Sequence, residues 1–270
     1  AQITGFNVDF NGADTTYTNN FLRYGDSTVG TTGLNWGENV GTNGSGGLVV
    51  SESSSRNVFY RPSPASNTTS TFDLSAASAS FTSTIDFKWA DTTATGLSVI
   101  TAGFVPDNGS QSALTSAGAL AGSIIRNNSS TVTLRMRNGN GNANSTLDFD
   151  QSTLTAGNWY RLSYELTKSE TENTFDYTVS LFSIGANGLS TPVLFNDGTK
   201  NITISGTVIN SALYNDENAF FAYDIRGGAT GISHVDNLVV ASSIPEPSAF
   251  AALAGLGALV AVGSRRRRST

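Results

Sequence analysis

Hydrophobic and polar residues alternate with a period of two in many short segments of residues 1–240. The alternation is clearest in 81–89, 160–166 and 175–181, where nearly every second residue is apolar. A period of two directs neighbouring side chains to opposite faces of an extended chain, so these segments are predicted to be β-strands with one buried face. The same pattern predicts shorter strands at residues 6–10, 58–60, 97–105, 121–125, 132–136, 202–204, 220–225 and 232–240.

Glycine and asparagine are concentrated between the predicted strands. Both residues tolerate the left-handed backbone conformation that many tight turns require. The turns expected on this basis lie at residues 107–109, 138–141, 156–158, 185–188 and 196–198. A dozen or more short strands, with frequent turns and no convincing soluble helix, predict an all-β protein built as a two-sheet antiparallel β-sandwich.

Residues 11–57 depart from this pattern, because they are rich in Gly, Ser, Thr and Asn and contain only scattered apolar positions. We expect them to form long loops at one edge of the sandwich, since they hold too little apolar surface for a second core. The prediction is therefore one β-sandwich domain over residues 1–241.

The composition limits the chemistry of the chain. None of its 270 residues is cysteine, which excludes disulfide bonds, thiolate metal sites and cysteine nucleophiles. The formal net charge is −6, but four of the 15 basic residues are Arg265, Arg266, Arg267 and Arg268. The rest of the chain has 11 basic and 21 acidic residues, a net charge of −10. Such a surface repels phosphate groups, so no nucleic-acid partner is expected.

An uncharged segment precedes these four arginines. Residues 248–263 number 16 and are mostly Ala, Leu, Val and Gly, and a helix of this length spans about 24 Å at 1.5 Å per residue. With flanking residues at the interfaces, the segment predicts a transmembrane helix over residues 248–264. The arginines predict a cytoplasmic tail at 265–270, which places the β-sandwich on the outer side of the membrane. A linker at 242–247 joins the two parts.

The C-terminal segment resembles the PEP-CTERM sorting signal of exported bacterial proteins. It combines Pro245, Glu246 and Pro247 with a short apolar run and an arginine cluster, and the resemblance covers residues 244–270. The resemblance implies an exosortase-type membrane processing enzyme as partner and cleavage near the Pro-Glu-Pro motif. It also implies a precursor anchored in the inner membrane, whose body then reaches the cell surface or the extracellular space. An ordinary tail anchor is the alternative.

The N-terminal end of the sequence fits the same route. The chain begins with Ala1 and Gln2, without an initiator methionine or an apolar leader. We therefore expect a mature product from which a signal peptide has been removed. An arbitrary boundary is the alternative.

Two motifs in the body resemble those of laminin-G/concanavalin-like jelly rolls. Residues 158–164 read Asn-Trp-Tyr-Arg-Leu-Ser-Tyr, and residues 236–240 close the domain with Asp-Asn-Leu-Val-Val. The resemblance covers nearly all of residues 3–240 and implies a jelly-roll arrangement of the two sheets. It does not define a function, because one fold supports many.

The jelly-roll resemblance also implies a structural Ca²⁺ site where the first and last strands meet. Asp9 lies on the predicted first strand and Asp236 on the last, and Asn237 offers a further oxygen. Carboxylate and carbonyl oxygens are the ligands that Ca²⁺ prefers. The alternative is that Asp236 caps a turn or faces solvent.

The sequence contains no recognisable catalytic motif. His234 is the only histidine, and Asp236 lies on the same face of its predicted strand, yet no Gly-x-Ser-x-Gly nucleophile motif accompanies them. Asp148 and Asp150 share a face, but they fit the solvent side of their strand equally well. We therefore expect no enzymatic activity. A glycan-active enzyme with an unrecognised carboxylate pair is one alternative.

Aromatic residues favour a second alternative, a carbohydrate-binding module with a polysaccharide partner. Trp36 is the main candidate for ligand binding, because its Gly- and Asn-rich surroundings are not those of a buried strand. Trp89 and Trp159 are expected in the core instead. The function that the sequence favours first is that of an exported, non-catalytic β-sandwich protein of the cell surface or the extracellular matrix.

Overall fold

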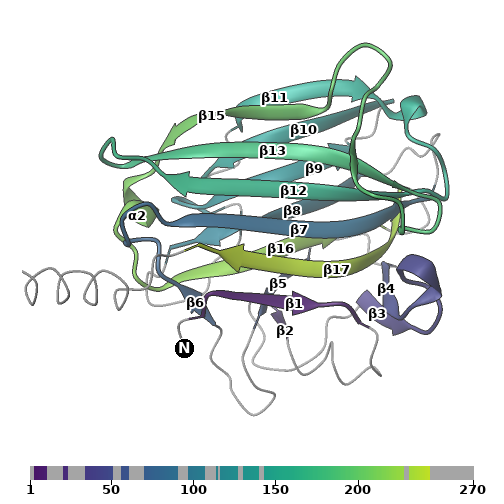
Figure 1. Ribbon diagram of the computed structural model, residues 1–270, viewed down its shortest axis with the longest axis horizontal. Coiled ribbons are helices and arrows are strands. Elements are labelled where there is room, and N and C mark those ends of the chain that lie inside the picture. The colour runs from purple at the N-terminus through teal and green to yellow at the C-terminus, as the bar shows by residue number, and fades with distance from the viewer. Residues whose placement is uncertain are drawn as a thin grey trace, which may run out of the picture.

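The chain folds into two stacked antiparallel β-sheets, which lie one behind the other in Figure 1. The computed structural model describes residues 3–10, 21–23, 34–50, 56–60, 70–90, 97–106, 114, 116–126, 130–139, 143–227 and 231–243. The alternating segments of the sequence become long strands in both sheets, because each strand buries its apolar face between them. The predicted all-β sandwich is confirmed.

The sheet nearer the viewer in Figure 1, here called the front sheet, has nine strands in the described part of the chain. Seven of them follow one another in the order β14 (Val193–Leu194), β13 (Thr174–Gly185), β12 (Trp159–Lys168), β7 (Ser80–Trp89), β17 (Ile232–Ser242), β4 (Gly47–Val50) and β3 (Leu34–Gly37). In addition, β1 (Gly5–Val8) pairs with β17, and β15 (Thr203–Ile209) pairs with β13. The first and last strands of the domain are therefore neighbours.

The second sheet, here called the back sheet, has eight strands in the described residues. Seven follow the order β11 (Ala143–Asp150), β10 (Thr131–Asn138), β9 (Leu120–Arg126), β8 (Ser98–Val105), β16 (Ala219–Arg226), β5 (Arg56–Tyr60) and β2 (Phe21–Arg23), and β6 (Thr71–Phe72) pairs with β16. Every residue of β8 and β9 is buried, so this part of the sheet is covered on both faces.

Helices are short in the described residues: α2 (Ser211–Tyr214) and the 3-10 turns η1 (Thr42–Gly44) and η2 (Gln151–Thr153). None of these helices is long and apolar enough to cross a bilayer. The predicted sorting motif at 245–247, the predicted membrane helix at 248–264 and the arginines at 265–268 lie outside the described residues.

A hydrophobic core fills the space between the sheets. Within it, the ring of Phe104 from the back sheet lies edge-to-face against Phe81 of the front sheet, with 4.9 Å between centroids. Phe104 makes the same kind of contact with Phe221 at 4.9 Å and with Phe72 at 5.7 Å. Edge-to-face pairs add to the free energy gained by burying the rings. These four side chains therefore join the two sheets.

Two features differ from the sequence-based expectation. Residues 11–57, expected as loops alone, contain the short strands β2, β3 and β4 and the start of β5. These strands have three to five residues, which is too short to show a period, and their partners in the sheets define them. Trp159, expected in the core, is 2% exposed but lies on the outer face of the front sheet, opposite Lys88.

We predict that Phe104→Ala lowers the free energy of unfolding by about 3–5 kcal/mol, because it leaves a cavity between the sheets. The measurement is urea unfolding of the purified chain. Ile209→Ala is the control, since Ile209 is 72% exposed and its truncation is expected to change stability by less than about 0.5 kcal/mol. Equal losses in the two variants would contradict this account of the core.

Candidate functional site

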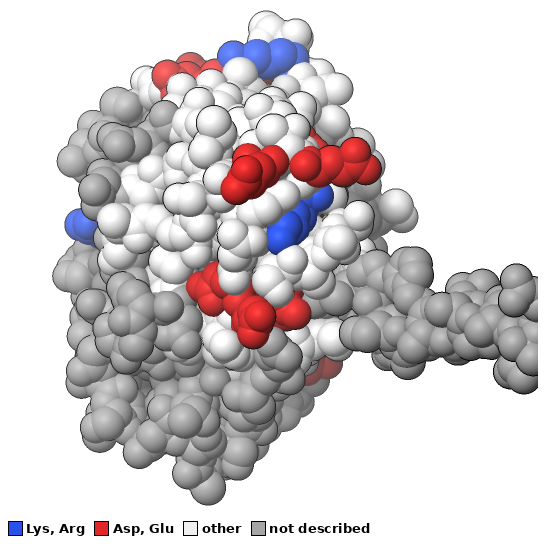
Figure 2. Space-filling view, turned by 90° about the vertical axis from the view of Figure 1, so that its left-hand side faces the viewer, with Lys and Arg blue, Asp and Glu red and all other residues white. Residues whose placement is uncertain are grey.

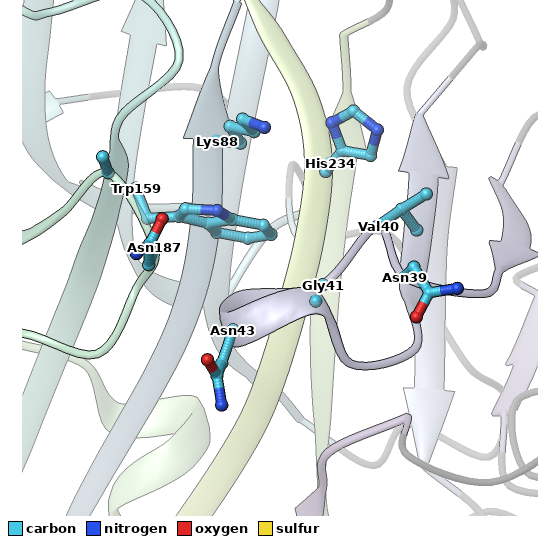
Figure 3. A pocket seen from close by; sticks show the side chains of 10 residues that line it. Asn39, Val40, Gly41, Asn43, Lys88, Trp159, Asn187 and His234 are labelled. Carbon is cyan, nitrogen blue, oxygen red and sulfur yellow. The ribbon is translucent and has the colours of Figure 1, made fainter.

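A pocket of about 470 Å³ opens on the outer face of the front sheet, at the end where β7 finishes and β12 and β17 begin. Its floor is one row of cross-strand neighbours, because Lys88 of β7 lies opposite both Trp159 of β12 and His234 of β17. Figure 3 shows these three side chains beside one another. The alternation of the strands turns all three away from the core.

Two loops form the walls of the pocket. The β3–β4 loop contributes Asn39 and Asn43, and the β13–β14 loop contributes Asn187. The backbone N–H of Asn43 donates a 2.6 Å hydrogen bond to the carbonyl oxygen of Asn187, which fastens the loops to each other. Asn39 and Asn43 have φ of 61° and 56°, a conformation that asparagine tolerates better than most residues. The walls are therefore turns with a defined backbone that carry asparagine side chains.

Two carboxylates lie beneath the β3–β4 loop in the next row of the sheet, where Asp86 is directly opposite Asp236. Both side chains are fully buried. Like charges that face each other across strands destabilise a sheet, so each carboxylate needs its own compensation. The two receive it from different parts of the chain.

Arg161 compensates Asp86. Its Nε and Nη2 donate hydrogen bonds of 2.6 Å and 2.8 Å to the two carboxylate oxygens, an arrangement that matches the fork of the guanidinium. The hydrogen bond to Asp86 raises the pKa of Arg161 above its ordinary value. The Asn237 side-chain amide donates a third hydrogen bond to Asp86, of 2.9 Å. Asp86 is thus held as one half of a neutral ion pair.

Asp236 is held by the β3–β4 loop. Its Oδ2 accepts 2.8 Å hydrogen bonds from the backbone N–H and the hydroxyl of Thr42, and a weaker one of 3.3 Å from the Ser45 hydroxyl. Its Oδ1 accepts from the backbone N–H of Asn237. Burial raises the pKa of Asp236, and the hydrogen bonds from Thr42 oppose that shift. The carboxylate therefore anchors the pocket wall to β17.

Glycine is required where the loop approaches this carboxylate. A Cβ on Gly41 would overlap the carbonyl oxygen of Gly46 and lie 2.8 Å from Oδ2 of Asp236. Such overlap forces the backbone to move, so only glycine fits here. Asn237 has φ of 48° at an irregularity of β17, where the register with β7 shifts between Asp236 and Val239. At this irregularity Asn237 donates to both carboxylates, from its backbone N–H to Asp236 and from its side-chain amide to Asp86.

The charge at the pocket floor is basic. Burial lowers the pKa of His234, and neighbouring Lys88 lowers it further. His234 Nδ1 lies 2.8 Å from the hydroxyl of Ser233. Within the described residues, neither an ion pair nor a hydrogen bond engages the Lys88 ammonium group. The floor therefore combines an unpaired cation with an imidazole that favours its neutral form.

The predicted site residues are placed as follows. Asp236 lies directly below the pocket wall, and its oxygens accept hydrogen bonds from Thr42 and from the backbone N–H of Asn237. The Ca²⁺ site expected there stays a prediction. Asp9 is exposed, beyond the pairing of β1 with β17. No metal-binding group of three or more His, Asp or Glu occurs among the described residues. Trp36 belongs to β3, opposite Leu48, and its side chain lies outside the described structure.

Sequence reasoning did not find most of this site. It placed His234 and Asp236 on one face, which the register confirms, but it did not connect them to Lys88, Asn43 or Asn187. The alternation of residues 81–89 did place Lys88 on the polar face. No sequence signal shows that β7, β12 and β17 are adjacent, because strand order depends on tertiary pairing.

Comparison with known proteins supports the fold. No protein-family model and no curated protein matches the chain. Among solved structures, the chain is similar to the winged bean acidic lectin complexed with methyl-α-D-galactose, with 12% identity and a TM-score of 0.50 over 90% of this chain and 99% of that one. It is also similar to a lectin from Bauhinia forficata in complex with GalNAc, with 8% identity and a TM-score of 0.50 over 89% and 98%. At these identities the likeness shows a lectin-like jelly-roll sandwich and no more.

We predict that Arg161→Leu lowers the free energy of unfolding by about 3–5 kcal/mol, because it leaves the buried Asp86 without a counter-charge. The double variant Arg161→Leu with Asp86→Leu is expected to recover a large part of this loss, since no isolated charge remains buried. Urea unfolding of both variants provides the measurement. A single variant as stable as the wild type would show that the ion pair does not anchor the floor.

Proposed function

We propose that the protein is a non-catalytic, carbohydrate-binding β-sandwich of lectin type, exported and sorted to the cell surface or extracellular matrix by its C-terminal tail. The observation that carries the binding function is the polar pocket on the front sheet. Its volume of about 470 Å³ lies within the range of roughly 300–1,000 Å³ that is usual for small-molecule sites.

The pocket walls match the chemistry of a sugar. A saccharide presents several hydroxyl groups, each of which donates and accepts hydrogen bonds. The side-chain amides of Asn39, Asn43 and Asn187 offer both donors and acceptors at the pocket surface. Trp159, which is 2% exposed, closes the floor beneath these amides. The two loops are cross-linked by a backbone hydrogen bond, so the groups are held in place before ligand arrives.

The fold supports the same proposal. The winged bean lectin and the Bauhinia forficata lectin were solved with methyl-α-D-galactose and with GalNAc. A sandwich of this shape therefore carries saccharide sites in those two proteins. The analogy adds to the pocket chemistry but does not replace it, because a fold alone does not define a function.

The sorting part of the proposal rests on the sequence of the tail. Pro245, Glu246 and Pro247 form the motif that an exosortase-type enzyme is proposed to recognise, and Arg265 to Arg268 hold the tail on the cytoplasmic side. Cleavage near the motif then releases the sandwich from the inner membrane. A surface location suits a saccharide-binding protein, since polysaccharides occur there.

We predict that Asn43→Gly weakens saccharide binding about fivefold to tenfold, which is the effect of losing roughly one hydrogen bond. Glycine retains the left-handed backbone of this position, so the loop is expected to keep its shape. The measurement is a glycan array that includes methyl-α-D-galactose and GalNAc, followed by calorimetric titration of the glycans bound.

Asn173→Gly is the matched control for this variant. Asn173 also has a positive φ, of 58°, but it lies in the β12–β13 turn at the far end of the sheet. Its replacement should leave binding unchanged. The binding proposal fails if the array shows no bound glycan, or if both variants bind as well as the wild type.

We predict that Pro245→Ala with Pro247→Ala keeps the full-length protein in the membrane, because the change removes both prolines of the motif that the enzyme is proposed to recognise. In a bacterial host that has an exosortase-type enzyme, the wild type should appear outside the cell as a shortened chain. Mass spectrometry of the membrane and extracellular fractions measures this. Pro192→Ala, a change in the sandwich, is the control. Intact wild-type chain in the cytosol would contradict the sorting proposal.

A further inference from the structure

We infer that the pocket prefers an acidic saccharide, one whose ring carries a carboxylate as in a uronic acid, over the neutral sugar of the same stereochemistry. The recognising group is the ammonium of Lys88. This inference rests on the proposed function and adds a ligand class to it.

The position of Lys88 is the first observation. Lys88 is in the middle of the floor row, with Trp159 on one side and His234 on the other. Neither neighbour carries a negative charge. No ion pair or hydrogen bond engages Lys88 Nζ in the part of the chain that the structure describes. A lysine on the floor of a half-enclosed pocket therefore has its charge available to a ligand (Figure 3).

The absence of acidic lining residues is the second observation. Of the ten described residues that line the pocket, none is Asp or Glu. The two carboxylates of the next row are engaged elsewhere: Asp86 by Arg161 and Asp236 by Thr42. They are already compensated by these partners, so they do not take the place of a counter-ion for Lys88. A ligand carboxylate would supply the missing partner.

The rest of the molecule shows that this feature is local. The net charge of the chain is −6, and the opposite end of the sandwich exposes Glu170, Glu172 and Glu217 near α2 and the β12–β13 turn. Figure 2 shows this end, where acidic side chains lie above and below one central basic patch. A chain of this charge does not attract anions in general. Anion binding must therefore depend on contact with the cation inside the pocket.

A planar carboxylate offers the pocket two acceptor oxygens. Lys88 and the side-chain amide of Asn187, which both line the pocket, are the donors that we propose for them. A carboxylate that accepts from the Lys88 ammonium forms a hydrogen-bonded ion pair, with attraction between two opposite charges. A neutral CH₂OH group in the same place accepts from the ammonium but lacks the second charge. The pocket should thus bind the acidic sugar more tightly than the neutral sugar that differs from it only at this group.

The test compares matched pairs by calorimetric titration: methyl-α-D-galactoside against methyl-α-D-galacturonide, and the corresponding glucoside against the glucuronide. We expect each uronide to bind about tenfold more tightly at low salt. The preference should shrink in 0.5 M NaCl, because salt screens the contact. Lys88→Gln should remove the preference, so that the two sugars of each pair bind with equal affinity, and Lys88→Arg should keep most of the preference.

Lys200→Gln is the control, since it removes the same charge from an exposed lysine outside the pocket, whose ammonium donates to the Asp148 carbonyl oxygen. Circular dichroism spectra that match the wild type show that each variant is folded. Equal affinity for the neutral and acidic sugars, or a preference that survives Lys88→Gln, would overturn this inference and leave the proposed function intact. Binding of no sugar, here or on the glycan array, would overturn both.

Discussion

Two buried carboxylates that face each other across β7 and β17 impose the main constraint on this structure. Asp86 and Asp236 are cross-strand neighbours on the outer face of the front sheet, and both are removed from water. An uncompensated pair would cost several kcal/mol. An arginine from β12 supplies a counter-charge to Asp86. A loop above the sheet supplies a backbone N–H and a hydroxyl as hydrogen-bond donors to Asp236. The shape of the loop follows from this requirement.

The pocket is a consequence of the same arrangement. Because Thr42 donates to Asp236, the β3–β4 loop lies at the edge of the floor row. The backbone N–H of Asn43 can then donate a hydrogen bond to the β13–β14 loop. The polar walls are thereby fixed before a ligand binds, which reduces the entropy lost on binding. One row along the sheet, no described residue forms an ion pair or a hydrogen bond with the Lys88 ammonium group. The row of Asp86 and Asp236 thus holds the loop, and the adjacent row presents the charge of Lys88.

The long strands could be predicted because every second residue in them is apolar and buried. Residues 81–89, 160–166 and 175–181 became parts of β7, β12 and β13, with alternate side chains in the core. Short strands such as β3 were not predicted, since four residues carry no usable period and the neighbour β4 defines them. Trp159 was expected in the core but lies on the outer face. The sequence could not show this, because a large apolar side chain that a loop buries on the outer face has the same sequence signal as a core residue.

The sequence by itself determined the all-β class, the resemblance to a jelly-roll sandwich and the polar face of β7 on which Lys88 lies. It also contains the Pro-Glu-Pro segment on which the sorting proposal rests. Only the tertiary structure decided that β12, β7 and β17 are adjacent, that Asp86 faces Asp236, and that two distant loops meet above them. Strand order and register depend on contacts between residues far apart in the chain, and a period along one segment contains no information about its partner.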